Sequence, residues 1–328
     1  MRDSPTQDAL RHYLTRYGDG CMSYSTLQPE LEYFVVEDKG YIAYLSFRHP
    51  LLTWAGRKIV LSNPICAASD YAELASAFLD QYPRAIFLQV DTRFAQVLHD
   101  MGHEVNCFGT EIELPASNFQ LKGKDRAKLR QWKNKCEREG VEVSNSRFSG
   151  MDHGEIQAVS KAWLKTKGGR EYSFLTRPFV LEDEPDARFF TARQKGKLIG
   201  FAVFDPIYRD GKVIGYFHNV DRILTDAPHG TSAYIILQAL SVFEQEGVSH
   251  VSLGLLPLFK LREIYRHNKF VHNALWFTFH KLNFLYPFQG NASHKRKFAG
   301  RQKQVYMCST QGNSLWELFI TMKVLELM

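Results

Sequence analysis

The chain has 328 residues, 45% of them hydrophobic and 23% charged, with a formal net charge of +6. These values are ordinary for a folded protein of about two domains, and the basic excess is too small to identify a partner. The sequence contains no run of about 18 apolar residues, and its N-terminal stretch has no apolar core of signal-peptide length. We therefore expect a cytoplasmic protein without a membrane-spanning helix.

The cysteines argue against a metal centre and against a disulfide framework. They are odd in number and scattered, and none forms a Cys-x-x-Cys or Cys/His ligand spacing. This pattern is typical of reduced thiols in a cytosol. We expect neither a metal nor a disulfide at these positions: Cys21, Cys66, Cys107, Cys136 and Cys308.

The first half predicts an alternating series of strands and helices. Val, Ile, Phe and Tyr density bounded by Gly, Asp and Pro predicts strands, and apolar residues three or four positions apart predict helices. The predicted order is strand 39–47, strand 57–63, helix 70–82, strand 84–91, helix 93–102 and strand 109–115.

A basic segment, LKGKDRAKLRQWKNKCEREG, follows this series. It predicts a linker helix over 122–140 that ends at Gly140, with Trp132 in the core. Its cations are candidates for binding the phosphates of RNA or anionic lipid headgroups. A solvated helix face is the other interpretation. The candidate residues are Lys124, Lys128, Arg130 and Lys133.

The second half repeats the order of the first at an offset of about 160 residues. The repeat predicts a mixed α/β (α+β) chain with two similar domains, 1–145, including the basic linker helix, and 146–328. A second basic stretch, HKRKFAGRQK, occupies 294–303, and the C-terminal LWELFITMKVLELM favours a packed helix over an interfacial anchor. The predicted elements are strand 195–204, strand 211–219, helix 231–247, strand 248–255, helix 258–268 and strand 273–281.

The stretch HNVDRILTDAPHGTS, residues 218–232, carries the strongest chemical signal. A strand that turns through glycine into a helix presents unpaired N–H groups and the positive end of the helix dipole. Gly230 allows close approach of a ligand, and Thr231 or Ser232 can cap the helix. We expect a phosphate-bearing group at this turn; a capped helix with nothing bound is the alternative.

Three titratable residues of this stretch, His218, Asp221 and His229, can accept a proton from an attacking hydroxyl or amine. Each taken alone also fits an ordinary structural role. Their position beside a predicted anion-binding turn favours catalysis. Other catalytic signatures are absent from the sequence: GxGxxG after the first strand, GxxxxGK[ST], HExxH and GxSxG.

These elements resemble known transferases. The β-β-α-β-α-β unit resembles the GNAT acyltransferase fold, and its duplication resembles the catalytic domain of the phosphatidylglycerol lysyltransferases, the aminoacyl-phosphatidylglycerol synthases. The resemblance covers about residues 20–310. It rests on KGYIAY, LSNPICAASDYAELASAFL, GTEIEL with LKGKDRAKLRQWKNKCEREGVEV, HNVDRILTDAPHGT, VSLGLLPL and YPFQGNASHKRKF.

The resemblance implies a reaction. An aminoacyl group would pass from aminoacyl-tRNA, a co-substrate, to a hydroxyl of an anionic phospholipid at the inner face of the membrane, without a cofactor or metal. The two halves would frame a tunnel entered by lipid from one side and by RNA from the other. Two alternatives stay open: an acyl-CoA-dependent N- or O-acyltransferase, and a non-catalytic RNA- or lipid-binding protein.

The resemblance also implies roles for particular residues. Asp221 and Arg222 fall at the family's acidic/basic pair, beside His218. The family spaces this pair three apart, and Leu224 stands at that place here. The late Lys-rich motif here continues as AGRQKQVYM, where the family runs on to a Pro and a Trp. The implied substrate-binding residues are His229, Gly230, Thr231, Lys295, Arg296 and Lys297.

Overall fold

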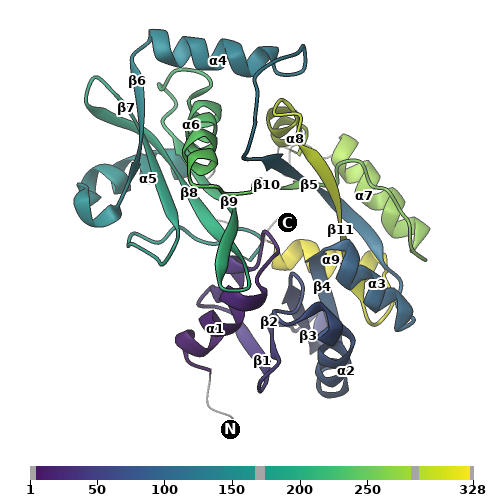
Figure 1. Cartoon of the computed structure of the whole chain (residues 1–328). Coiled ribbons are helices and arrows are strands. Elements are labelled where there is room, and N and C mark those ends of the chain that lie inside the picture. Colours follow the sequence, from purple (N-terminus) through teal and green to yellow (C-terminus); the bar gives the residue numbers. More distant parts are fainter. Residues whose placement is uncertain (1–4, 167–173, 282–287, 326–328) are drawn as a thin grey trace.

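The structure is a computed structural model that describes residues 5–166, 174–281 and 288–325 (Figure 1). The elements of the first half are α1 (Gln7–Tyr17), β1 (Glu32–Val36), β2 (Gly40–His49), β3 (Thr53–Leu61), α2 (Tyr71–Gln81), β4 (Ala85–Val90), α3 (Thr92–Asp100), β5 (Asn106–Pro115) and α4 (Ala127–Arg138). Those of the second half are β6 (Val141–Ser146), α5 (His153–Thr166), β7 (Arg188–Gln194), β8 (Lys197–Arg209), β9 (Lys212–Ile223), α6 (Thr231–Gln245), β10 (His250–Pro257), α7 (Lys269–Lys281), α8 (Phe288–Arg296), β11 (Arg301–Ser309) and α9 (Leu315–Val324).

The eleven strands of the described residues form one continuous sheet, in the order β1-β2-β3-β4-β11-β5-β10-β9-β8-β7-β6. The mixed α/β class predicted from the sequence is confirmed. Strands are exchanged at the centre, because β11 of the second half lies between β4 and β5 of the first. The division of the chain near residue 145 stays a prediction: β6 spans that position and pairs with β7.

Each half contains one parallel pair of strands that is joined through a helix. In the first half β3 pairs with β4 after the crossover through α2, and in the second half β9 pairs with β10 after the crossover through α6. A parallel pair needs such a crossover. The β-β-α-β order predicted for both halves is therefore present, with boundaries that shift by a few residues.

Two predicted elements of the second half are wrong. Residues 258–268 form no helix, because Leu258 and Lys260 have positive φ angles of 59° and 49°, which a right-handed helix does not allow. Residues 273–281 lie in the helix α7 and not in a strand. The late strand of this half is β11, which begins within the second basic stretch.

The error at α7 has a physical cause. A short aromatic run satisfies strand composition as well as helix periodicity. Val271, Leu275 and Thr278 of α7 are buried at a spacing of four and three residues, which fits a helix with one buried side. The helical spacing is present in the sequence, but the aromatic content of the segment favours the strand prediction.

The helices α4 and α9 behave as the sequence predicted. In α4, which begins at Ala127, Leu129, Trp132 and Cys136 are buried, and α4 packs against α6. In α9, Leu318 and Ile320 are buried and the helix packs against α7. The interpretation of the C-terminal segment as a packed helix is confirmed for residues up to Leu325.

Candidate functional site

The candidate site lies where β9 and β10 separate. The two parallel strands pair at only three positions, His250 with Gly215, Val251 with Tyr216 and Ser252 with Phe217. Beyond these pairs β9 continues to Ile223 and β10 to Pro257 without further pairing between them. The sheet therefore opens on the C-terminal side of Phe217.

A bulge in β9 brings His218 and Asp221 to the same face of the sheet. Residues three apart in a regular strand point to opposite faces. Here the register with β8 shifts, so that Val220 is opposite Val203 and His218 is opposite Phe204. The extra residue reverses the alternation. The His218 ring lies tilted against Phe204, with ring centroids 5.1 Å apart, on the face that α6 covers.

Asp221 is oriented by the first turn of α6. The Ser232 hydroxyl donates a hydrogen bond to Asp221 Oδ2. The same carboxylate acts electrostatically on Lys295 of α8. Asp221 of β9 is thus hydrogen-bonded to the start of α6 and interacts electrostatically with a lysine from a distant part of the chain.

His218 is held in its neutral form. Burial, with the positive charges of Lys295 and His294, lowers the pKa of His218 to about 3. Its Nε2 atom is buried and has no hydrogen-bond partner within the described residues. A neutral imidazole with an unused ring nitrogen is available to hydrogen-bond a substrate hydroxyl.

Lys295 lies in the opening itself. Its Nζ donates a hydrogen bond of 3.1 Å to the carbonyl oxygen of Leu255 in β10. Burial lowers the pKa of Lys295 to about 8, against the raising effect of Cys21, Asp221 and Glu111. The ammonium therefore holds its proton only weakly near neutral pH. It can stabilise negative charge and can also give up a proton.

The polar side chains of the site are largely enclosed by protein without being fully buried. His218, Lys295 and Glu111 are surrounded by protein. Each nevertheless keeps part of its surface accessible. Polar side chains that are enclosed yet partly accessible are candidates for ligand binding.

The structure does not bring Arg222 to this group. Adjacent residues of a strand point to opposite faces, and Arg222 points toward α5. Its Nη1 donates to the Ser160 hydroxyl, and its guanidinium lies 5.3 Å and 5.1 Å from the ring centroids of Trp163 and Phe179. Arg222 therefore holds α5 against β9.

The turn into α6 is closed by the indole of Trp132. Gly230 has φ 105°, and a Cβ at this position would lie 2.5 Å from Trp132 Cβ and Cγ. The Thr231 hydroxyl is buried and donates to the Pro228 carbonyl. His229 is exposed, with its ring 5.3 Å from Trp132. Close packing with α4 accounts for the glycine; anion binding at this turn stays a prediction.

The three basic residues of the late motif separate. Lys295 points into the opening, whereas Arg296 lies over the Phe259 ring at 5.2 Å and Lys297 lies 5.4 Å from the Trp132 ring. Burial lowers the pKa of Lys297, and the positive charges of Lys128 and Arg296 lower it further. Lys128, Arg296 and Lys297 thus form a cationic group outside the opening, between α4 and α8.

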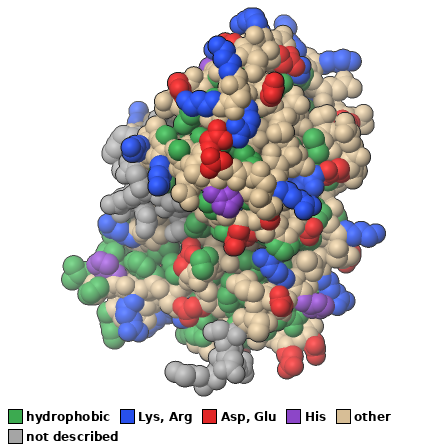
Figure 2. All heavy atoms as spheres, turned by 90° about the vertical axis from the view of Figure 1, so that its left-hand side faces the viewer, with side chains coloured by type: hydrophobic (Ala, Val, Ile, Leu, Met, Phe, Trp, Pro, Cys, Tyr) green, Lys and Arg blue, Asp and Glu red, His purple; other side chains and the backbone are tan. Residues whose placement is uncertain are grey.

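The other predicted polyanion contacts are spread along α4 and the loop before it. Lys124 is exposed. Arg130 is occupied by backbone carbonyls, among them that of Gly123 at 2.7 Å, and Lys133 pairs with Glu137. At the top of the molecule, where α4 lies, Figure 2 shows basic side chains mixed with acidic ones. Polyanion binding along α4 stays a prediction.

Sequence reasoning missed the residues that the first half contributes. Glu111 of β5 and Cys21 lie close enough to Lys295 to affect its charge. Ser252 of β10 donates to Glu111. No local motif marks these residues. Glu111, for example, reaches the site through the pairing of β5 with β10, which places it opposite Leu255.

In residues 5–166, 174–281 and 288–325 no three His, Cys, Asp or Glu side chains are placed to hold a metal ion. No helix there is long and apolar enough to cross a membrane. All five cysteines are free and buried.

Comparison with known proteins identifies the family. The model of the phosphatidylglycerol lysyltransferase C-terminal family matches residues 11–309. The chain belongs to this family. It is 24% identical to a phosphatidylglycerol lysyltransferase of Bacillus subtilis (strain 168) over 276 residues, 80% of the chain and 31% of that relative. It is 23% identical to one of Staphylococcus haemolyticus over 312 residues, 92% of the chain and 35% of that relative.

Solved structures of the family share the fold. The structure of L-PGS from Bacillus licheniformis matches with a TM-score of 0.80 at 21% identity, over 99% of this chain and 98% of that one. The C-terminal domain of a putative lysylphosphatidylglycerol synthetase from Agrobacterium fabrum matches with a TM-score of 0.75 at 21% identity, over 95% of both chains. The family resemblance inferred from the sequence is confirmed. The chain spans about a third of the length of the curated relatives it matches.

The packing of Gly230 against Trp132 predicts the cost of a methyl group at this turn. Gly230→Ala combines an unfavourable left-handed backbone, about 1–2 kcal/mol, with overpacking against the indole, about 1–3 kcal/mol. The control is Gly247→Ala, at φ 75° with nothing within 4 Å of the added carbon. In urea unfolding we expect Gly230→Ala to lose clearly more stability than Gly247→Ala. Equal losses would contradict the close packing.

The buried neutral His218 predicts a stability that depends on pH. Its pKa is about 3 in the folded chain and about 6.5 when unfolded, so between these values the unfolded chain binds the extra proton. Stability therefore falls as pH falls from about 6.5 toward 3. Urea unfolding of His218→Gln should show a shallower decline than the wild type over this window. An identical slope in both proteins would show that His218 is already charged when folded.

Proposed function

We propose that this chain transfers an aminoacyl group from aminoacyl-tRNA to a hydroxyl of an anionic phospholipid. The observation that carries the proposal is the placement of His218 and Asp221 opposite Lys295 at the opening between β9 and β10. Membership of the phosphatidylglycerol lysyltransferase C-terminal family supports this reaction class.

The reaction moves an acyl group between two oxygens. The lipid hydroxyl attacks the ester carbonyl, a new C–O bond forms, and the bond to the 3′ oxygen of the RNA breaks. Asp221, oriented by Ser232, accepts the proton of the attacking hydroxyl. Neutral His218 holds that hydroxyl by a hydrogen bond. The Lys295 ammonium stabilises the oxyanion and donates a proton to the leaving oxygen, and the proton on Asp221 then restores the lysine.

The cationic group of Lys128, Arg296 and Lys297 supports an RNA donor. It lies beside Trp132 between α4 and α8, and Arg296 and Lys297 follow Lys295 directly. Phosphates near the 3′ end of a charged RNA would be attracted there while the ester reaches Lys295.

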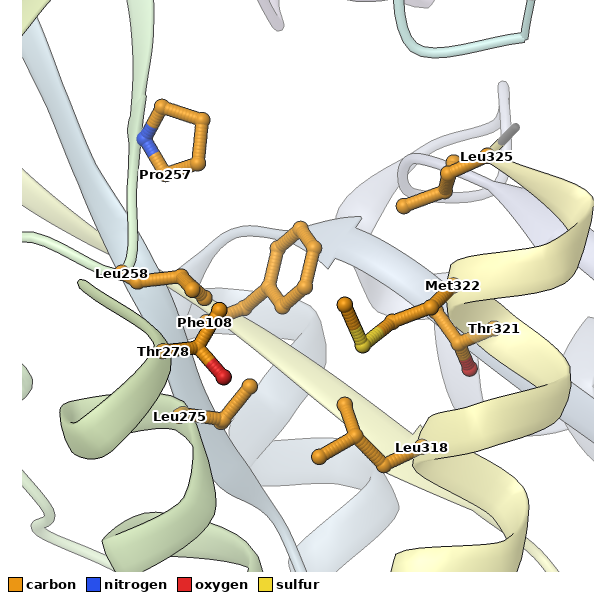
Figure 3. A pocket seen from close by; sticks show the side chains of 9 residues that line it. All are labelled: Phe108, Pro257, Leu258, Leu275, Thr278, Leu318, Thr321, Met322 and Leu325. Carbon is orange, nitrogen blue, oxygen red and sulfur yellow. The ribbon is translucent and has the colours of Figure 1, made fainter. Parts of the chain in front are cut away.

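Apolar side chains near the end of β10 support a lipid acceptor. A small apolar cavity lies between α7 and α9, lined among others by Phe108, Leu258, Leu275 and Met322 (Figure 3). Its lining includes Pro257, the last residue of β10, two residues after Leu255.

The outward face of α7 fits a bilayer surface. Phe270, Trp276 and Phe277 are exposed by 75%, 51% and 50%. Lys269 and Lys281 stand at the two ends, and the helix contains no acidic residue. Aromatic residues with flanking lysines are favoured at the interface of an anionic membrane. This supports peripheral contact with the membrane through α7.

The alternative acyl-CoA donor is less well supported. A CoA pyrophosphate would need the N-terminal turn of α6 as its anion site. Trp132 packs against Gly230 at that turn, and the Thr231 hydroxyl is bound to Pro228.

The proposed proton acceptor predicts the outcome of a transfer assay. Labelled amino acid is followed from a mixed charged-tRNA pool into vesicles that contain phosphatidylglycerol. We expect Asp221→Asn to fold and to lose about 100-fold or more of the rate, because general base catalysis contributes about that much. The control Asp226→Asn, at an exposed position of the same loop, should keep wild-type transfer.

Unchanged transfer by Asp221→Asn would remove this carboxylate from the chemistry. Tight binding of acetyl-CoA by calorimetry, without transfer from charged tRNA, would overturn the proposed donor.

The aromatic face of α7 predicts vesicle binding. Trp276→Ala with Phe277→Ala should weaken cosedimentation with phosphatidylglycerol vesicles at least about tenfold, because two large apolar side chains are lost from the interface. Trp54→Ala is the matched control, since Trp54 is 80% exposed on the β2–β3 hairpin and should bind as the wild type does. Loss of binding in Trp54→Ala alone would place the membrane contact on the hairpin instead.

A further inference from the structure

Glu111 is a largely enclosed carboxylate that neighbours Lys295 and Lys303 without forming an ion pair with either. The Ser252 hydroxyl donates a hydrogen bond of 2.8 Å to its Oε1, and the Cys21 thiol is a second hydrogen-bond partner. Among the described residues it takes part in no salt bridge. Its two lysine neighbours have other partners, since Lys303 pairs with Glu113 and Lys295 donates to Leu255.

Burying such a carboxylate is unfavourable. Desolvation raises the pKa of Glu111, because a buried charge that forms no ion pair is unfavourable. A well-packed apolar residue at this place in β5 would serve the fold better. Because neither lysine forms an ion pair with it, the carboxylate is a candidate for binding a cationic group of a ligand.

Gln89 supplies a second unused acceptor, and it is linked to Glu111 through Cys21. It is 4% exposed, and its Oε1 has no hydrogen-bond partner within the described residues. Its Nε2 lies 3.9 Å from Cys21 Sγ, and Cys21 is the hydrogen-bond partner of Glu111. Gln89 also has φ 56°, a left-handed conformation that costs energy outside glycine and that clusters at binding sites.

These acceptors lie next to the reaction centre. Leu255, whose carbonyl binds Lys295, is the residue opposite Glu111 in the β5–β10 ladder. Lys295 responds to the charges of both Glu111 and Asp221. The acceptors of the first half and the proton acceptor of the second half thus lie around one lysine.

We propose that Glu111 and Gln89 Oε1 bind a primary ammonium group of the aminoacyl moiety being transferred. An ammonium carries three donors, and the two carboxylate oxygens and the amide oxygen are three acceptors. Ser252 orients the carboxylate. The inference rests on the proposed function, because an aminoacyl ester carries such an ammonium on its α-carbon, and a lysyl ester carries another on its side chain.

Calorimetry with small esters tests the subsite without RNA or lipid. The probes are alanine methyl ester, with only the α-ammonium, Nα-acetyllysine methyl ester, with only the side-chain ammonium, and N-acetylalanine methyl ester, with neither. The wild type should bind at least one amine-bearing ester and not the third. Glu111→Gln, which keeps the size and the hydrogen bond to Ser252, should weaken that binding at least about tenfold.

The control and the contrary outcomes are separate from the transfer assay. Glu142→Gln makes the same charge change at an exposed position of β6 and should bind as the wild type. If the alanine ester binds, the subsite takes the α-ammonium. If the acetyllysine ester binds, the subsite takes the side-chain ammonium. Equal binding by folded Glu111→Gln, equal binding of N-acetylalanine ester, or no binding of either amine-bearing ester to the wild type would overturn the subsite. If the wild type shows no transfer from charged tRNA to lipid but binds the esters in a Glu111-dependent way, the proposed function is overturned and the subsite is not.

Discussion

The early end of pairing between β9 and β10 is the constraint on which the site depends. After Ser252 and Phe217 the strands diverge, and an opening in the middle of a sheet leaves backbone groups that must be satisfied. Lys295 from α8 meets that need at the Leu255 carbonyl. The same contact fixes an ammonium at the point where the two halves of the chain meet.

Burial then gives the surrounding groups their chemical character. Enclosure keeps His218 neutral and lowers the pKa of Lys295 to about 8, while the pKa of Glu111 rises. In a medium of low polarity each remaining charge acts strongly on its neighbours. The structure therefore places a neutral imidazole, an ammonium with a lowered pKa and a carboxylate with a raised pKa around the end of β9–β10 pairing.

Local sequence patterns predicted much of the fold and part of the site. The repeated strand and helix order was readable because each element carries its own periodicity, whereas α7 was misread because its aromatic run also fits a strand. The local pattern predicts His218 and Asp221, the family resemblance implies Lys295, and the three residues do lie together. Arg222 was predicted with them, yet strand alternation sends it to the other face. Glu111 was missed because its place depends on the pairing of β5 with β10, which no local pattern encodes.

The most direct test is a crystal structure of the protein with an aminoacyl-adenosine whose ester is replaced by an amide at the 3′ position. The account predicts that the amide carbonyl lies near Lys295 Nζ, on the side of Asp221, with the ammonium of the amino acid at Glu111. An analogue bound at the N-terminal turn of α6, or on the outer surface of α4 with the opening between β9 and β10 unfilled, would contradict it.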